Sequence, residues 1–422
     1  MFQKVTLSND LHILTEKVPH VRSVALGFWV DVGSRDEVPE NNGVSHFIEH
    51  LLFKGTQKRS AKQIAETLDA VGGQLNAFTT KEYTCFYARV LDEHFDLAFD
   101  LLNDMLFGSN FATNDIDRER NVIIEEIKMY EDAPDELVHD VFAGSMWQGH
   151  ALGRPIIGTA EVIAQIPREK IIEFYQTHYN PGNLVVTVAG NIEHEAVICK
   201  LRPVLEARKG SRPVRSMLAP LPKRDIVCRS KDTEQVHLCL GTPGLSLDNK
   251  KSYTFQIINT VLGGGLSSRL FQEIREQRGL VYSVYSYHSS YHDTGLFCIY
   301  AGLSKQNVDE ALSLIFKQIN DIRKNSITPE ELQRAKDQLK GNLLLSLESV
   351  STRMSRLGKS QLYLGKIVQP EEVVEKLNKV TIEDVRELSL EMLDPVNFSL
   401  ATIGPWEDCG NLVKALGNLK AL

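Results

Sequence analysis

A repeat in the order of strands and helices is the feature that most restricts the fold of this chain. A strand-like segment at residues 183–190 resembles another at 397–404, and the two begin 214 residues apart in a chain of 422. Residues 209–222 form a polar segment that carries Gly210 and several prolines, which is typical of a linker, and we place the linker at 211–222. We therefore predict an α+β protein of two homologous halves, residues 1–210 and 223–422, joined by this linker.

Hydrophobic periodicity predicts alternating strands and helices within each half. In the first half, strands are expected at 22–32, 75–90 and 183–190, and helices at 43–54, 61–71, 93–107, 115–131 and 168–178. In the second half, strands are expected at 235–242, 281–288, 294–302 and 397–404, and helices at 250–262, 264–277, 305–324, 328–347 and 370–390. The alternative topology is a single α/β sheet of many strands.

Composition excludes two classes of partner. Hydrophobic residues make up 42% and charged residues 24% of the chain, as in soluble globular proteins. The net charge of −8 argues against nucleic acid and anionic membranes, because both favour basic surfaces. No apolar run reaches the roughly 20 residues that a membrane-spanning helix needs. We therefore expect no nucleic acid and no membrane among its partners.

The N-terminus and the cysteines favour a cytoplasmic protein. The first ten residues show neither a signal peptide pattern nor a transit peptide pattern. Six scattered cysteines without a Cys-x-x-Cys pair predict reduced thiols rather than a disulfide framework. These are Cys85, Cys199, Cys228, Cys239, Cys298 and Cys409.

A metal-binding pattern lies in the predicted helix 43–54. His46, Glu49 and His50 occupy positions i, i+3 and i+4, which share one helical face. Two imidazoles one turn apart can bind one zinc ion, and a neighbouring Glu can deprotonate a bound water. The order His-x-x-Glu-His is the reverse of His-Glu-x-x-His, and both are zinc peptidase patterns. The pentapeptide alone also fits two histidines satisfied by ordinary hydrogen bonds.

A third ligand can come from the predicted helix 115–131. Glu119 and Glu126 are seven residues apart and lie on one helical face, whereas Glu125 points about 100° away from Glu126. Glu126 as a ligand, with Glu119 supporting the site, is a coherent pairing. A solvated acidic helix is the alternative.

Three stretches, at residues 43–56, 72–79 and 119–126, carry a resemblance to a known family. The chain resembles the pitrilysin/insulinase zinc peptidases over essentially its whole length. In size and motif it is most similar to the β subunit of mitochondrial processing peptidase and its small bacterial relatives. In that family the third ligand follows the second His by about 76 residues, and Glu126 follows His50 by 76.

The resemblance implies roles for the residues of the first half. His46, His50 and Glu126 would bind one Zn²⁺ per chain, Glu49 would be the general base on the zinc-bound water, and Glu119 would support the ligands. The resemblance also implies that Asn76, Ala77 and Phe78 belong to an edge strand that binds an extended substrate by backbone hydrogen bonds.

In the second half, the family places an Arg and a Tyr seven residues apart in the zinc site. Arg275 and Tyr282 match that spacing. Arg275 would hold a substrate carbonyl, and Tyr282 would donate to the carbonyl or to the oxyanion. Without the resemblance, Arg275 would be read as an ordinary surface residue of a helix and Tyr282 as an aromatic residue of a strand.

The resemblance also implies an architecture and a substrate. Each half is expected to hold two related α/β-sandwich subdomains, and the halves to close as a clamshell around peptides or unfolded protein segments. The expected activity is that of a metalloendopeptidase. The expected assembly is a homodimer, and a single chain whose two halves close on each other is the alternative. A scaffold subunit without activity is the alternative class. A structural zinc site would need a fourth protein ligand, and the sequence suggests none nearby. A phosphoesterase would need more Asp and His ligands for two metals, and the sequence does not offer them.

Overall fold

The computed structural model describes residues 2–215 and 217–408, which form two compact units. Each unit is built mainly from one half of the sequence, with one segment contributed by the other half. The described part of the first unit comprises residues 2–128, 154–215 and 346–367. The described part of the second unit comprises residues 129–153, 217–345 and 368–408.

The first unit contains a six-stranded sheet with the order β1-β2-β6-β3-β5-β4. Its strands are β1 (Phe2–Thr6), β2 (His12–Lys17), β3 (Ser23–Val30), β4 (Gln74–Thr79), β5 (Thr84–Leu91) and β6 (Leu184–Gly190). Strands β3 and β6 are rich in Val, Leu and Ala and are buried almost throughout. A strand with no polar face must be covered on both sides, which makes these two the centre of the sheet.

The second unit contains a five-stranded sheet with the order β7-β11-β8-β10-β9. Its strands are β7 (Ile226–Ser230), β8 (Val236–Gly244), β9 (Val281–Ser290), β10 (Gly295–Leu303) and β11 (Ser399–Gly404). Strand β7 runs parallel to β11, and the remaining neighbours are antiparallel.

The two sheets share one topology. In the first unit, β2 is parallel to β6, and β6, β3, β5 and β4 follow as antiparallel neighbours. In the second unit, β7, β11, β8, β10 and β9 repeat these relations in the same order. The predicted repeat is therefore confirmed, and the alternative of one large sheet is wrong. The expectation of two subdomains in each half is also wrong, because the described residues of each unit form one sheet.

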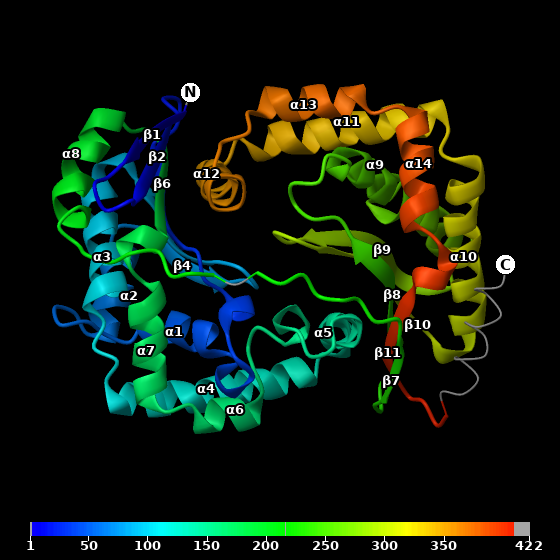
Figure 1. Cartoon of the computed structure of the whole chain (residues 1–422), viewed down its shortest axis with the longest axis horizontal. Coiled ribbons are helices and arrows are strands. Elements are labelled where there is room, and N and C mark those ends of the chain that lie inside the picture. Colours follow the sequence, from blue (N-terminus) through cyan, green and yellow to red (C-terminus); the bar gives the residue numbers. More distant parts are fainter. Residues whose placement is uncertain (1, 216, 409–422) are drawn as a thin grey trace. The chain divides into compact units, whose positions relative to one another are not determined.

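Helices cover both faces of the first sheet. They are α1 (Val44–Leu52), α2 (Ala61–Asp69), α3 (Phe95–Gly108), α4 (Thr113–Glu131), α6 (Ala160–Gln165), α7 (Arg168–His178), α8 (His194–Leu205) and α12 (Val350–Leu364). Alternate residues of β3, such as Leu26 and Phe28, enter the main core, while Ala25 and Trp29 face the other way. In Figure 1, α12 lies on that second face, opposite α3 and α8.

The second sheet is covered in the same manner. Its helices are α5 (Pro134–Met146), α9 (Ser252–Gly263), α10 (Val308–Asn325), α11 (Pro329–Ser346), α13 (Pro370–Lys379) and α14 (Ile382–Met392). Leu238 and Leu240 of β8 enter the core with α9, α10 and α14, while Cys239 faces α5. Helix α5 contacts β7, β8 and β11 (Figure 1).

Helices α5 and α12 are exchanged between the two sequence halves. Helix α5 follows α4 in the first half of the sequence but packs on the second sheet. Helix α12 follows α11 in the second half but packs on the first sheet. The domain boundaries predicted from sequence were continuous ranges and did not include this exchange. The predicted linker at 211–222 does fall between α8 and β7, in a stretch without helix or strand.

Two predicted elements are each two elements in the structure. The predicted strand 75–90 is the hairpin of β4 and β5, because Thr80 and Tyr83 form a turn in which the Thr80 amide donates to the Tyr83 carbonyl at 2.9 Å. The predicted helix 370–390 is α13 and α14. Thr381 caps the start of α14, where its hydroxyl accepts from the Asp384 amide at 3.1 Å, so the chain turns there.

The described cysteines are of two kinds, free and disulfide-bonded. Cys85, Cys199, Cys239 and Cys298 are free thiols, as predicted, whereas Cys228 is disulfide-bonded, which contradicts the prediction for that residue. Cys409 lies outside the described residues.

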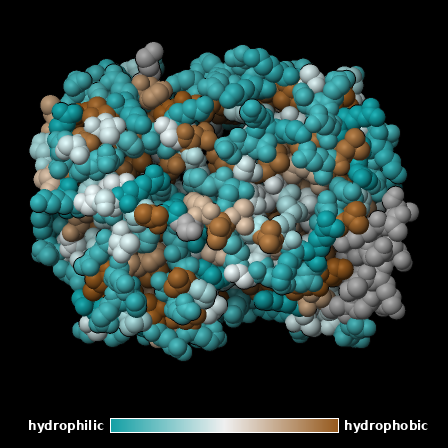
Figure 2. Space-filling model, viewed as in Figure 1, coloured by the Kyte–Doolittle hydropathy of each residue, from teal (hydrophilic) through white to brown (hydrophobic). Residues whose placement is uncertain are grey.

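None of the helices in residues 2–215 and 217–408 is long and apolar enough to cross a membrane. On the face shown in Figure 2, hydrophobic side chains are dispersed in small groups among hydrophilic ones.

Candidate metal centre and active site

Helix α1 positions three chemically important side chains on its partly exposed face. Phe47 and Ile48 are buried in the core, which fixes the rotation of the helix. His46, Glu49 and His50 are consequently half-buried and lie together on the opposite side.

A buried carboxylate fixes the N-terminus of α1. Gly43 precedes the helix with a φ of 97°, a left-handed conformation that glycine adopts without strain. Glu37 accepts hydrogen bonds from the amides of Gly43 at 2.7 Å and Ser45 at 2.8 Å. Burial raises the pKa of Glu37 to about 7, against the effect of these hydrogen bonds. Sequence reasoning missed Glu37, because its contact with the helix depends on the turn at 39–43.

The structure brings His46, His50 and Glu126 together in the first unit. One ligand atom from each residue lies within 4.8 Å of the others. Nε2 of His46 is 3.9 Å from Oε1 of Glu126, and Nε2 of His50 is 3.6 Å from Oε2. Two imidazole nitrogens and a carboxylate oxygen are donors that zinc accepts, so these residues fit that ion.

The other ring nitrogen of His50 faces Glu119. Its Nδ1 lies 3.1 Å from Oε2 of Glu119, a carboxylate that is only 5% exposed. Lys54 Nζ contacts Oε1 of the same carboxylate at 2.9 Å. A carboxylate on Nδ1 fixes the proton there, which orients the ring and leaves Nε2 free to bind a metal.

Burial keeps His46 in the neutral form that a metal ligand requires. Desolvation, followed by the repulsion of His50, lowers the pKa of His46 to about 3. The rings of the two histidines lie 4.7 Å apart. Two imidazolium ions at that separation would repel each other, which adds to the preference of His46 for its neutral form.

Glu49 is held by a residue of β4. The hydroxyl of Thr79 donates a hydrogen bond of 2.5 Å to Oε2 of Glu49. Burial raises the pKa of Glu49, while the Thr79 hydrogen bond and His50 oppose that rise. Thr79 was not singled out from the sequence, since nothing in the spacing of the two residues indicates the contact.

The predicted substrate strand is β4, which lies at an edge of the first sheet and, among the described residues, pairs with β5 alone. The amide of Ala77 donates to the side chain of its neighbour Asn76 at 2.8 Å. Asn76 is exposed. Phe78 instead packs its ring against Trp29 and Tyr83, which anchors the strand to the sheet.

Arg275 and Tyr282 belong to the second unit and lie beside each other. The guanidinium of Arg275 is 5.9 Å from the centre of the Tyr282 ring. The predicted helix 264–277 is helical only in its second part, because residues 264–268 form bends and turns. Arg275 lies on one turn of π-helix, Phe271–Glu276, which is wider than an α-helix. Tyr282 is skipped in the pairing of β9 with β10, because Leu303 opposes Val281 and Gly302 opposes Ser283. This bulge leaves Tyr282 74% exposed.

Comparison with known proteins decides the family. Residues 12–160 match the model described as insulinase (peptidase family M16), and residues 165–339 match the peptidase M16 inactive domain. The chain is 44% identical to an uncharacterized zinc protease of Bacillus subtilis over 96% of this chain and 98% of that protein. The chain belongs to peptidase family M16. An uncharacterized zinc protease of Streptomyces coelicolor is also 44% identical, over 96% of this chain and 90% of that protein.

Solved structures share the M16 fold at low sequence identity. A peptidase M16 inactive domain protein from Pseudomonas fluorescens has a TM-score of 0.90 at 21% identity, covering 96% of this chain and 98% of that chain. A protease from Helicobacter pylori has a TM-score of 0.89 at 21% identity, covering 96% and 99%. At this identity the likeness concerns the fold alone.

Proposed function

We propose that this M16 chain is a zinc-dependent endopeptidase that hydrolyses peptides or unfolded protein segments. The observation that carries the proposal is the convergence of His46, His50 and Glu126, with Glu49 on the same helix one turn from His46. His46 and His50 would bind zinc through Nε2, and Glu126 through a carboxylate oxygen. When bound there, zinc would polarise the scissile carbonyl and make water more acidic.

Glu49 would act on the attacking water as general base. Its raised pKa brings its proton affinity closer to neutral pH, and a base is most effective when its pKa lies near the working pH. The hydrogen bond from Thr79 would hold one carboxylate oxygen and leave the other free to take the proton. Glu49 would then pass this proton to the leaving amine.

The free edge of β4 would bind the substrate as an added strand. Backbone hydrogen bonds along β4 would give affinity without demanding a particular side chain. Because Thr79 of the same strand contacts Glu49, a peptide paired with β4 would be aligned along the residue that acts as base. This would favour extended or unfolded segments over folded proteins.

Arg275 and Tyr282 would complete the site from the second unit. Arg275 would hold a substrate carbonyl, and the Tyr282 hydroxyl would donate to the oxyanion. This proposal requires the two units to close around the peptide as a clamshell, and one such chain per subunit of a homodimer is the assembly we propose. Tyr282 is well exposed for such a role.

The Glu49→Gln variant tests the proposed function. It should keep zinc, measured by metal analysis, yet lose hydrolysis of an internally quenched peptide. Glu125→Gln, an exposed change on α4, is the matched control and should keep both properties. Full activity in Glu49→Gln would remove Glu49 from the mechanism.

A scaffold role without catalysis is the second candidate. The fold also matches a chain of Complex III2 from Candida albicans, with a TM-score of 0.84 at 21% identity over 99% of both chains. The grouping of His46, His50 and Glu126, with Glu49 on the helix of the two histidines, favours the peptidase. A purified wild-type protein that binds zinc but cleaves no peptide in a library would favour the scaffold.

A further inference from the structure

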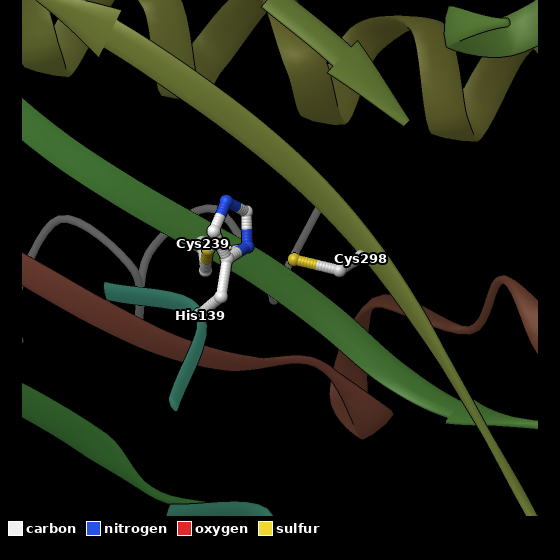
Figure 3. A group of neighbouring side chains, drawn as sticks. All are labelled: His139, Cys239 and Cys298. Atoms are coloured by element: carbon white, nitrogen blue, oxygen red, sulfur yellow. Dashed lines mark hydrogen bonds between the residues drawn. The ribbon is translucent and has the colours of Figure 1, made fainter. Parts of the chain in front are cut away.

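A second group of metal-ligating side chains lies in the second unit. His139 of α5, Cys239 of β8 and Cys298 of β10 each offer one ligand atom, and these atoms lie within 4.8 Å of one another. Figure 3 shows the imidazole of His139 beside the two sulfur atoms. Nδ1 of His139 is 3.3 Å from Sγ of Cys239. None of these residues belongs to the M16 zinc pattern described above.

The fold itself brings the two thiols together. Strands β8 and β10 are antiparallel neighbours in which Cys239 opposes Tyr300 and Cys298 opposes Gly241. The two cysteines are therefore diagonal neighbours on one face of the sheet. Both are fully buried beneath α5, the exchanged helix that supplies His139. Ligands so far apart in sequence could not have been grouped by spacing alone.

Tyrosines orient the imidazole toward the sulfur atoms. Nε2 of His139 lies 3.3 Å from the hydroxyl of Tyr285, and Nδ1 lies 2.7 Å from the hydroxyl of Tyr287. With the proton on Nε2, Nε2–H donates to Tyr285. The single lone pair of Nδ1 faces both the Tyr287 hydroxyl and Cys239, so a bound metal ion would replace the hydrogen bond from Tyr287. The remaining bond from Nε2–H to Tyr285 is of the outer kind that is typical of histidines that bind metals.

The distances suit one small metal ion. Zn–S bonds of about 2.3 Å and Zn–N bonds of about 2.0–2.1 Å place a nitrogen and a sulfur ligand, or two sulfur ligands, roughly 3.5–3.8 Å apart in a tetrahedral site. The Nδ1–Sγ separation of 3.3 Å is slightly shorter than that range, so a small outward shift of the two atoms would admit the ion. The thiolate is the form of cysteine that binds metals, so both thiols would release their protons when an ion binds.

An adjacent pocket supplies an entry path. It has a volume of about 660 Å³ and is lined by residues that include His139, Tyr285 and Tyr300. Asp135 and Glu136 also line it, and their carboxylates attract cations. Three protein ligands leave the fourth tetrahedral position open to a water or a small ligand.

We propose that His139, Cys239 and Cys298 form a second metal site, selective for thiophilic ions of the Zn²⁺ class. Two sulfur donors and one imidazole favour such ions over Mg²⁺ or Ca²⁺, which take oxygen ligands. The site lies wholly in the second unit, so it does not depend on the proposed peptidase mechanism. It raises the expected content from one to two metal ions per chain.

Cobalt substitution tests this site directly. The reduced full-length protein is stripped of metal and titrated with Co²⁺, and the ultraviolet spectrum is followed for thiolate-to-cobalt charge transfer. The cluster of His46, His50 and Glu126 contains no sulfur, so it cannot produce this band. Wild type should show the band and bind two Co²⁺, and the zinc form should show sulfur at about 2.3 Å in X-ray absorption.

Variants assign the band to residues. Cys298→Ser and His139→Gln should each lose the band and one equivalent of metal, while circular dichroism stays that of wild type. Cys85→Ser, a buried thiol of the first unit, and Cys199→Ser, an exposed one, are the matched controls and should keep it. Glu126→Gln should also keep it, which separates this site from the proposed active site.

Three results would overturn the proposal. One is a reduced wild-type protein that takes up Co²⁺ without a charge-transfer band. Another is a band that persists in both Cys298→Ser and His139→Gln. The third is a Cys239–Cys298 disulfide, detected by mass spectrometry in the purified protein, whose reduction does not restore metal binding.

Discussion

The hydroxyl of Thr79 donates a 2.5 Å hydrogen bond to the carboxylate of Glu49, and so joins the edge strand β4 to the helix that carries His46 and His50. This contact stabilises the charged form of Glu49 against the burial that raises its pKa. It makes the protonation of the proposed base depend on a residue outside the zinc-binding pattern.

Thr79→Val should therefore move the acid limb of activity to higher pH. Without the hydrogen bond, the pKa of Glu49 rises further, so less carboxylate is available at a given acidic pH. We expect kcat/KM at mildly acidic pH to fall about five- to tenfold, as for the loss of one hydrogen bond of roughly 1–1.4 kcal/mol. The measurement is the pH profile of kcat/KM. Thr79→Ser keeps the hydroxyl and should keep the wild-type limb; a shift of equal size in Thr79→Ser would reject the explanation.

Glu119→Gln should weaken zinc binding more than it affects folding. The variant loses the charged partner of His50 Nδ1, and losses of this kind cost about 10- to 100-fold in metal affinity. Competition with a chelator of known affinity measures the change. Glu125→Gln removes an exposed carboxylate that pairs with Lys128 on the same helix, and should leave zinc affinity unchanged. Equal affinities in the two variants would mean that Glu119 does not support the site.

Tyr282→Phe should lower turnover more than peptide binding. The hydroxyl is proposed to act on the oxyanion, and the loss of one such donor costs about 10²–10³ in kcat. Steady-state kinetics on a quenched peptide separate kcat from KM. Tyr253→Phe, in α9 of the same unit, is the control and should keep the wild-type kcat. A Tyr282→Phe enzyme with unchanged kcat would show that the exposed ring has another purpose.

Gly358→Ala should destabilise the first unit. A methyl group at Gly358 of α12 would lie 2.2 Å from Cε2 of Trp29, a ring that is completely buried. Such overpacking costs about 1–3 kcal/mol. Gly341→Ala in α11 meets nothing within 4 Å, so the better helix propensity of alanine should stabilise the protein by about 0.5–1 kcal/mol. Urea unfolding of both variants measures the two effects; a Gly358→Ala protein as stable as wild type would contradict the close packing of α12.

The sequence predicted the repeat because both halves carry the same strongly apolar strands in the same order. It also singled out His46, Glu49, His50 and Glu126, because residues at such spacings share one face of a helix whatever the helix packs against. It could not predict contacts that depend on three-dimensional packing. Thr79 reaches Glu49 across two elements, and Glu37 reaches the start of α1 through an irregular turn.

The same limit explains the missed elements. Helix α12 contains few strongly apolar residues, and its glycine at 358 lowers its helix propensity, yet it lies tightly on Trp29. The cluster of His139, Cys239 and Cys298 joins one helix and two strands. In sequence these residues were isolated, so the cysteines were read as unrelated thiols.

Because α5 and α12 are exchanged, neither half of the chain carries the helix that covers the second face of its own sheet. Cutting the chain within 211–222 would give two fragments, each with the helix that belongs to the other's sheet. Alone, each fragment would expose an apolar sheet face that includes Trp29 in one case and Tyr300 in the other, and should aggregate. Expressed together, the fragments should reassemble, since each carries the missing cover of its counterpart. The molecule is thus suited to split-protein complementation, in which recovery of solubility reports the meeting of two polypeptides.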